Sequence, residues 1–222
     1  MCAIHGYCWQ DEKLIGEMLC KAHHRGPDGQ GTFFNDDISL GHNLLAITDR
    51  PSQSNQPWEY KDIVLVFNGE IYNYIEIRDN LRKKGITFKT SSDTEVVAAA
   101  YVYYGKKCLE LFEGMWAFVI FDTKSKSLFL SRDRFGEKPI FYYKTDYGFY
   151  FASDVSFISS LAEKKFSINA DKGWLGITDK YWITSLIPQE NRKFRTDFDY
   201  KNKFRANFIT TEPLELNQNS SI

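Results

Sequence analysis

Cys2 lies directly behind Met1 and opens a short apolar run, MCAIHGYCW. If Met1 is removed, a thiol and a free α-amine belong to the same residue. The pKa of a thiol is about 8.5 and that of an α-amine about 7.7–8.0, so the amine can accept the thiol proton near neutral pH. It can then return that proton to a leaving group. Position alone leaves two interpretations open, a nucleophile or a small buried hydrophobic residue.

Six further segments follow in order between residues 24 and 143: HRGPDGQG, LGH, NGEIYNY, SDTE, EGMWAF and SRDRFGEKPIFYY. In this order and spacing they resemble the glutamine amidotransferase domain of glutamine-hydrolysing asparagine synthetases, which is an N-terminal-nucleophile hydrolase domain. The resemblance covers about residues 1–165. It implies an α+β fold, a four-layer αββα sandwich with the nucleophile at the tip of a central strand.

The resemblance also implies a role for each matching residue. Cys2 matches the nucleophile that attacks the side-chain amide of L-glutamine, while Asn68 and Gly69 match the oxyanion hole. Glu70 matches a carboxylate that contacts the substrate, and Asp93 matches the acid that pairs with its α-amine. The implied reaction passes through a γ-glutamyl thioester on Cys2, with release of ammonia and then of glutamate.

Each of these residues also has a simpler interpretation. Asn68-Gly69 is the strongest hairpin-turn dipeptide, although a helix signal follows it here. Asp93 could simply favour a helix N-terminus through the helix dipole. The occurrence of all six segments in order favours the functional interpretation.

Leu44 departs from the family pattern. The family usually carries an arginine two residues after the histidine of its LGH segment, where it holds the α-carboxylate of glutamine. Here the segment is LGHNLLAITD, with Leu44 at that position and Arg50 six residues on as the candidate substitute. Losing one charged hydrogen bond costs about 1.5–3 kcal/mol. A catalytically impaired relic of the fold therefore stays open as the alternative function.

In full-length members of the family, a synthetase domain follows the amidotransferase domain. It activates aspartate with ATP and carries a Ser-Gly-Gly-x-Asp-Ser loop, and no such run occurs in these 222 residues. The resemblance therefore implies no cofactor for this chain, since ATP and Mg would belong to the missing synthetase domain. The ammonia acceptor would be a separate synthetase.

Apolar spacing predicts the elements that must position these residues. Strands are predicted near 3–9, 31–34, 38–42, 44–48 and 62–67, and again in MWAFVIFD, SLFLSRD, PIFYYK and GFYFAS. Helices are predicted at 11–23, at 74–84 and after residue 92. The two later helices start with capping-box spacing, Asn73 with Glu76 and Ser92 with Glu95. This order favours α+β layering.

Composition excludes several classes of protein. A net charge of −1 with 26% charged residues argues against nucleic-acid binding. No stretch approaches the roughly 18 apolar residues of a membrane span, and no signal peptide is recognisable at the start. A cytoplasmic location is therefore expected.

The cysteines are Cys2, Cys8, Cys20 and Cys108, and none forms a C-x-x-C pair. Disulfides are not expected without a secretory signal. The first three could in principle gather a metal with His23 or His24. Their spacing fits no common zinc pattern, so no metal site is predicted.

The composition changes near residue 165, which sets the predicted end of the amidotransferase domain. Residues 172–210 resemble a fragment of the periplasmic domain of YidC-type membrane protein insertases, mainly through GWLGITDKYW. Aromatic residues then alternate in the pattern of a β-hairpin: Phe194, Phe198, Tyr200, Phe204 and Phe208. The prediction is a poorly packed appendage at 166–211, from a composite chain or an unrelated extension that packs on the sandwich, and a disordered tail at 212–222.

Overall fold

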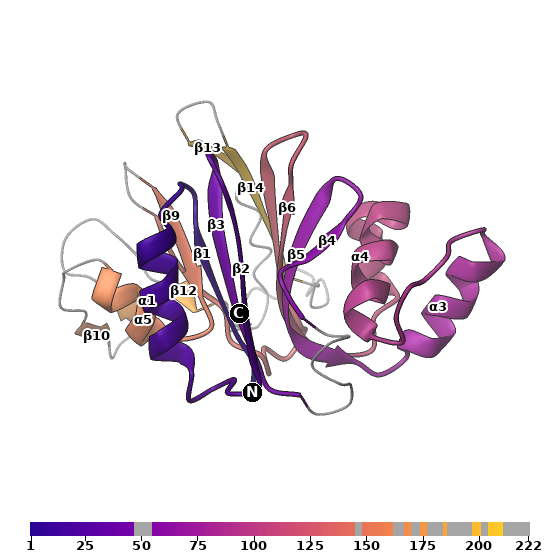
Figure 1. Ribbon diagram of the computed structural model, residues 1–222, viewed down its shortest axis with the longest axis horizontal. Coiled ribbons are helices and arrows are strands. Elements are labelled where there is room, and N and C mark those ends of the chain that lie inside the picture. Colours follow the sequence, from indigo (N-terminus) through magenta and orange to yellow (C-terminus); the bar gives the residue numbers. More distant parts are fainter. Residues whose placement is uncertain are drawn as a thin grey trace, which may run out of the picture.

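The computed structural model describes residues 1–46, 55–144 and 148–161, and beyond them the backbone of five short strands. Two six-stranded sheets pack face to face, with helices on their outer sides (Figure 1). The first sheet has the order β12 (Thr184–Ser185), β8 (Phe141–Lys144), β9 (Phe149–Ala152), β1 (Ala3–Tyr7), β3 (Ile38–Leu44) and β2 (Gly29–Asn35). The second has the order β13 (Asp197–Tyr200), β14 (Phe204–Thr210), β7 (Ser127–Arg132), β6 (Gly114–Asp122), β5 (Ile63–Ile71) and β4 (Trp58–Tyr60).

Helices cover the outer face of each sheet (Figure 1). The first sheet carries α1 (Glu12–Ala22) and α5 (Val155–Leu161). The second carries α4 (Asp93–Tyr104), which runs into the 3₁₀ helix η1 (Gly105–Glu110), and α3 (Tyr74–Lys83) packs against α4. Strands β10 (Ser167–Asn169) and β11 (Trp174–Gly176) form a separate pair. The four layers confirm the predicted αββα sandwich.

Strand alternation divides the core into an inner layer between the sheets and two outer layers beneath the helices. On β5, Val64 and Val66 belong to the inner layer, whereas Ile63, Leu65 and Phe67 pack toward α4. On β1, Ile4 belongs to the inner layer. Because successive side chains of a strand point to opposite faces, Asn68 and Glu70 continue the inner face of β5. The same alternation places Cys2 on the inner side of β1.

Asn68 and Gly69 lie inside β5, where they pair with Ala117 and Trp116 of β6. The hairpin-turn interpretation of this dipeptide is therefore wrong. The strand continues because β6 offers a paired partner along the whole of β5. Tertiary pairing here outweighs the local turn preference.

The predicted capping boxes form only in part. Asn73 does not cap α3, and its side chain instead contacts the backbone of Leu111 and Glu113 at 2.9 and 3.0 Å. Ser92 does cap α4 by accepting from Thr94 N at 3.2 Å. The carboxylate of Glu95 turns back to the N–H groups of residues 89 and 90 rather than to the cap. Both departures satisfy polar backbone groups outside the helix.

Strands β13 and β14 form the antiparallel hairpin that aromatic alternation predicted. Strand β14 also runs parallel to β7, from Arg205 beside Ser127 to Thr210 beside Arg132, so the hairpin continues the second sheet. The edge of β7 is thus paired rather than open, while the packing of residues 166–211 stays a prediction. Residues 212–222 lie outside the described residues, and the boundary at 165 stays a prediction. None of the helices in the described ranges is long and apolar enough to cross a membrane.

Candidate active site

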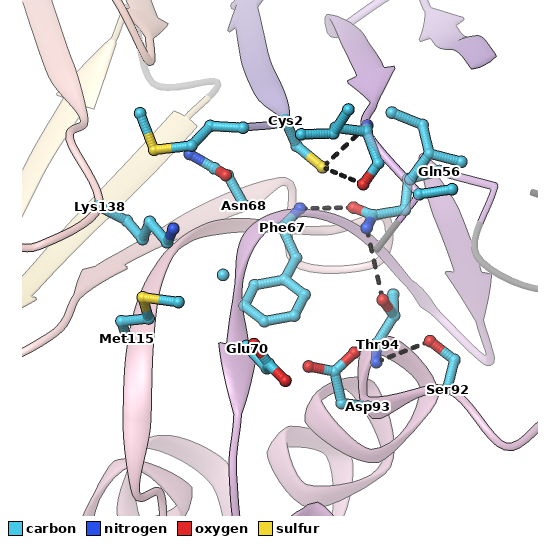
Figure 2. Close-up of a pocket in the computed structure, with 15 residues that line it drawn as sticks. Cys2, Gln56, Phe67, Asn68, Glu70, Ser92, Asp93, Thr94, Met115 and Lys138 are labelled. Carbon is cyan, nitrogen blue, oxygen red and sulfur yellow. Dashed lines mark hydrogen bonds between the residues drawn. The ribbon is translucent and has the colours of Figure 1, made fainter. Parts of the chain in front are cut away.

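A pocket opens between the two sheets, beside the start of β1 and the far end of β5 (Figure 2). Its walls come from the N-terminus, the end of β3, the loop before β4, the last third of β5, the start of α4, the start of β6 and the loop after β7. The lining residues are Met1, Cys2, Leu44, Leu45, Ala46, Gln56, Phe67, Asn68, Gly69, Glu70, Ser92, Asp93, Thr94, Met115 and Lys138.

Cys2 places its half-buried thiol at the head of this pocket. Leu45 N donates to its Sγ at 3.4 Å, and the thiol lies 3.7 Å from Leu45 O as a donor. Burial raises the pKa of Cys2, while the Leu45 N–H, the N-terminal ammonium and Lys138 each act to lower it. Burial has the largest effect, so the thiol is protonated at neutral pH.

The N-terminus is fixed by Arg25, in the HRGPDGQG segment. The Met1 ammonium donates to Arg25 O at 3.2 Å, and Arg25 Nη2 donates to Cys2 O at 3.4 Å. The same guanidinium lies 3.9 Å from the carboxylate of Asp154. With Met1 in place, the Cys2 nitrogen belongs to a peptide bond and cannot act as a base.

Asn68 presents an amide that is available as a hydrogen-bond donor. The residue is 2% exposed, and its Nδ2 has no hydrogen-bond partner among the described residues. An unpaired buried donor is costly, and such groups occur where a ligand is to be bound. Neighbouring Gly69 allows β5 to approach β6 closely, since a Cβ there would lie 2.3 Å from Met115 O.

Glu70 and Asp93 bring two carboxylates to the end of the pocket away from Cys2 (Figure 2). Asp93 is the first residue of α4, and its Oδ2 accepts from Ile71 N at 3.0 Å. This bond joins the start of α4 to the end of β5. The structure therefore brings together Cys2, Asn68, Gly69, Glu70 and Asp93, all of which were predicted from sequence.

Gln56 is a structural residue of the pocket that the sequence did not indicate. Its Oε1 accepts from Phe67 N at 2.6 Å, and its Nε2 donates to Thr94 Oγ1 at 3.4 Å. The side chain thus ties β5 to α4 behind the site. It sits in a polar loop, RPSQSNQPW, whose composition predicts only a loop.

Leu44 lies in the pocket wall and is 4% exposed, so an apolar side chain stands where the family carries its arginine. Arg50, the candidate substitute, lies outside the described residues. Lys138 does line the pocket. It belongs to the SRDRFGEKPIFYY segment, but no sequence pattern singled it out.

The cysteines and histidines proposed as a possible metal site do not come together. Cys8 is buried, whereas Cys20 is exposed on α1. Within the described part of the chain, no group of three histidine, cysteine, aspartate or glutamate residues is placed to hold a metal ion.

Comparison with known proteins agrees with this geometry. Residues 1–198 match the family described as the glutamine amidotransferase domain. The chain belongs to this family. A putative glutamine-hydrolysing asparagine synthetase 2 of Methanocaldococcus jannaschii is 36% identical, with 94% of this chain and 44% of that protein covered. Glutamine-hydrolysing asparagine synthetase 1 of Bacillus subtilis is also 36% identical, with 92% and 34% covered.

Solved structures show the same fold. The glutamine phosphoribosylpyrophosphate amidotransferase of B. subtilis, complexed with ADP and GMP, has a TM-score of 0.60 at 17% identity and covers 86% of this chain and 50% of its own. The allosteric regulatory enzyme of purine biosynthesis has a TM-score of 0.64 at 17% identity.

This glutamine amidotransferase domain spans less than half the length of the two asparagine synthetases it matches. The family match runs through residue 198, beyond the predicted boundary. The comparisons give no support to an insertase-like fragment at 172–210.

Proposed function

We propose that the domain hydrolyses the side-chain amide of L-glutamine to glutamate and ammonia once Met1 has been removed. The observation that carries the proposal is the shared pocket of Cys2 and Asn68, whose Nδ2 has no partner among the described residues, with the carboxylates of Glu70 and Asp93 beyond them. A thiol, an oxyanion donor and an ammonium-binding end are the groups that amide hydrolysis of an amino acid requires.

In the first half of the reaction, the α-amine of processed Cys2 accepts the thiol proton. The sulfur then bonds to the amide carbon, and the carbonyl oxygen becomes an oxyanion that accepts from Asn68 Nδ2 and Gly69 N. The carbon–nitrogen bond breaks as the ammonium of Cys2 returns its proton to the departing nitrogen, which leaves as ammonia. In the second half, water attacks the thioester carbon and gives a proton to the Cys2 amine. The carbon–sulfur bond then breaks, the sulfur takes that proton back to restore the thiol, and glutamate leaves.

The far end of the pocket would hold the amino-acid end of the substrate. Asp93 and Glu70 are the proposed partners of the substrate ammonium, since an ammonium is held by carboxylates with charge-assisted hydrogen bonds. Arg50 remains the proposed partner of the α-carboxylate, because Leu44 cannot bind one.

The destination of the ammonia belongs to the same proposal. Because the relatives are asparagine synthetases, a separate synthetase that uses ATP and Mg is the proposed acceptor. A cytoplasmic location is also proposed. It is supported by the four free thiols, Cys2, Cys8, Cys20 and Cys108, which fit a reducing compartment.

A glutaminase assay with Cys2→Ala tests the proposal. Mass spectrometry first establishes that Met1 has been removed from the purified chain. Processed protein should release glutamate, Cys2→Ala should release none above background, and Cys20→Ala, which removes an exposed thiol, should match the parent. If processed protein shows no Cys2-dependent release, the relic interpretation replaces this one.

A further inference from the structure

The loop after β7 holds Lys138 in a fixed position beside the pocket. Asp133, which is 2% exposed, accepts four backbone N–H groups. Its Oδ1 accepts from Phe135 and Glu137, each at 3.0 Å, and its Oδ2 accepts from Trp116 at 3.2 Å and Lys138 at 3.1 Å. The backbone of Lys138 is therefore anchored to β6 through one buried carboxylate.

The Lys138 side chain extends from this loop toward Asn68 (Figure 2). Among the lining residues that the structure describes, it is the only lysine or arginine. The other charged groups of the pocket are the carboxylates of Glu70 and Asp93 and the ammonium of Met1. Removal of Met1 moves the terminal amine onto Cys2, where the proposed reaction uses it to exchange protons with the thiol. Lys138 is then the one cationic side chain among the described lining residues.

We propose that the ammonium of Lys138 stabilises two negative charges at the thiol end of the pocket. These are the Cys2 thiolate and the oxyanion that forms beside Asn68. The thiolate part rests on the structure alone, and the oxyanion part rests on the proposed glutaminase function. Lys138 exchanges no proton in this role. It acts as a positive charge beside a partly buried thiol, where such a charge is worth more than in water.

Two observations favour the thiol end over the amino-acid end of the pocket. The positive charge of Lys138 is one of the causes that lower the pKa of Cys2 against the effect of burial. In Figure 2, Lys138 and Asp93 lie on opposite sides of Phe67, and Asp93 marks the proposed ammonium end. A partner of the substrate α-carboxylate would instead lie next to Asp93.

The first test measures Cys2 reactivity and needs no glutaminase activity. The rate at which iodoacetamide alkylates Cys2 is followed against pH by peptide mass spectrometry in the processed chain. Lys138→Met should raise the midpoint by about half to one pH unit, since a nearby charge shifts a pKa by this order. Lys138→Arg should restore the parent midpoint. Lys107→Met, which removes an exposed lysine on η1 outside the pocket, should leave it unchanged.

The second test separates charge stabilisation from substrate binding. Lys138→Met should lower kcat for glutamine about tenfold with KM within twofold, the pattern of a group that acts in the transition state. Lys138→Arg should recover most of kcat. Lys138→Gln is a second neutral variant in case methionine disturbs the loop, and a urea unfolding curve checks each fold.

An unchanged alkylation midpoint in both neutral variants would overturn the proposal. A raised KM with unchanged kcat would also overturn it, because that result makes Lys138 a partner of the substrate carboxylate. If the parent chain has no glutaminase activity, the alkylation arm still decides whether Lys138 stabilises the thiolate. Failure of the proposed function and failure of this inference are therefore distinguishable.

Discussion

Cys2 and Asn68 face each other because each follows the alternation of its own strand. Cys2 lies two positions before the inner-layer residue Ile4 of β1, and Asn68 lies two positions after Val66 of β5. Both side chains therefore point into the space between the sheets. Two residues 66 positions apart in the chain thus meet through register rather than through a local motif. The chemistry of each can be tested separately.

Asn68→Ala should remove one oxyanion donor without opening the core. We expect kcat to fall by a factor of about 10²–10³, with little change in KM, because the lost bond forms mainly in the transition state. Steady-state glutaminase kinetics measure both constants. Asn80→Ala, an exposed asparagine on α3, is the matched control. Equal kinetics for the two variants would mean that Asn68 is not a donor.

Leu44→Arg should restore the carboxylate-binding residue of the family. One charged hydrogen bond contributes about 1.5–3 kcal/mol, so we expect KM for glutamine to fall between about tenfold and a hundredfold. Leu44→Met, which keeps an apolar side chain of similar volume, should leave KM unchanged. A KM that does not fall in Leu44→Arg would show that another residue already holds the carboxylate.

The sequence predicts the site residues that stand in family segments, but not those whose role depends on partners distant in the chain. Cys2, Asn68, Gly69, Glu70 and Asp93 stand in family segments, and the structure gathers all of them into one pocket. The bridging role of Gln56 depends on partners in β5 and α4, which no local pattern indicates. Lys138 likewise reaches the pocket only because Asp133 folds its loop back onto β6.

At the scale of elements, β5 carries two functions along one strand. Its first part fills both apolar layers, and its last part lines the pocket. Local turn and capping signals predicted this region less well than apolar spacing did. The reason is that β6 pairs with β5 past Asn68, and the Asn73 side chain finds backbone partners near η1 instead of a helix end.

Gly69→Ala should separate β5 from β6. The added Cβ would meet backbone atoms, Met115 O at 2.3 Å and Trp116 Cα at 2.7 Å, which cannot move without shifting β6. We expect a loss of about 1–3 kcal/mol in the free energy of unfolding, together with loss of activity. Urea unfolding measures the first.

Gly16→Ala is the matched control for that substitution. A Cβ on Gly16 in α1 would meet nothing within 4 Å. Alanine in a helix interior is favoured over glycine by about 0.5–1 kcal/mol, so the free energy of unfolding should rise. Equal effects of the two substitutions would contradict the close approach at Gly69.

Two buried histidines make the first sheet sensitive to acid. Burial lowers the pKa of His5 on β1 to about 3, with repulsion from His42 adding to it, and burial lowers the pKa of His42 on β3 to about 3. Neither ring nitrogen of His5 has a hydrogen-bond partner in the described ranges. Both rings are therefore neutral in the folded chain at neutral pH.

His5→Phe should flatten the acid dependence of stability. The unfolded chain binds protons at histidine below about pH 6.5 and the folded chain only near pH 3, so stability falls as pH drops through this window. Each histidine should cost about 2 kcal/mol between pH 7 and pH 5. Urea unfolding at both values should show a smaller loss in His5→Phe. His23→Phe, at an exposed histidine, should keep the parent slope.

At the scale of the whole molecule, the tail strands complete the second sheet. Truncation after residue 196 removes β13 and β14 and leaves the edge of β7 unpaired. Open edges promote association of chains, so we expect more self-association than in a chain truncated after residue 211. Light scattering coupled to size-exclusion chromatography measures the molar mass of each truncated chain and so its self-association. Identical masses for the two truncations would contradict a structural role for the hairpin.

The contact between Met1 and Arg25 has a practical consequence for anyone who produces this protein. The amine that the proposed reaction needs forms only when the Met1–Cys2 peptide bond is cut, and Cys2 lines the pocket. An affinity tag or fusion partner at the N-terminus would leave a chain that folds and keeps its thiol but has no base. Recombinant protein should therefore carry its tag at the C-terminus. The mass of an inactive preparation should be measured to establish whether Met1 has been removed.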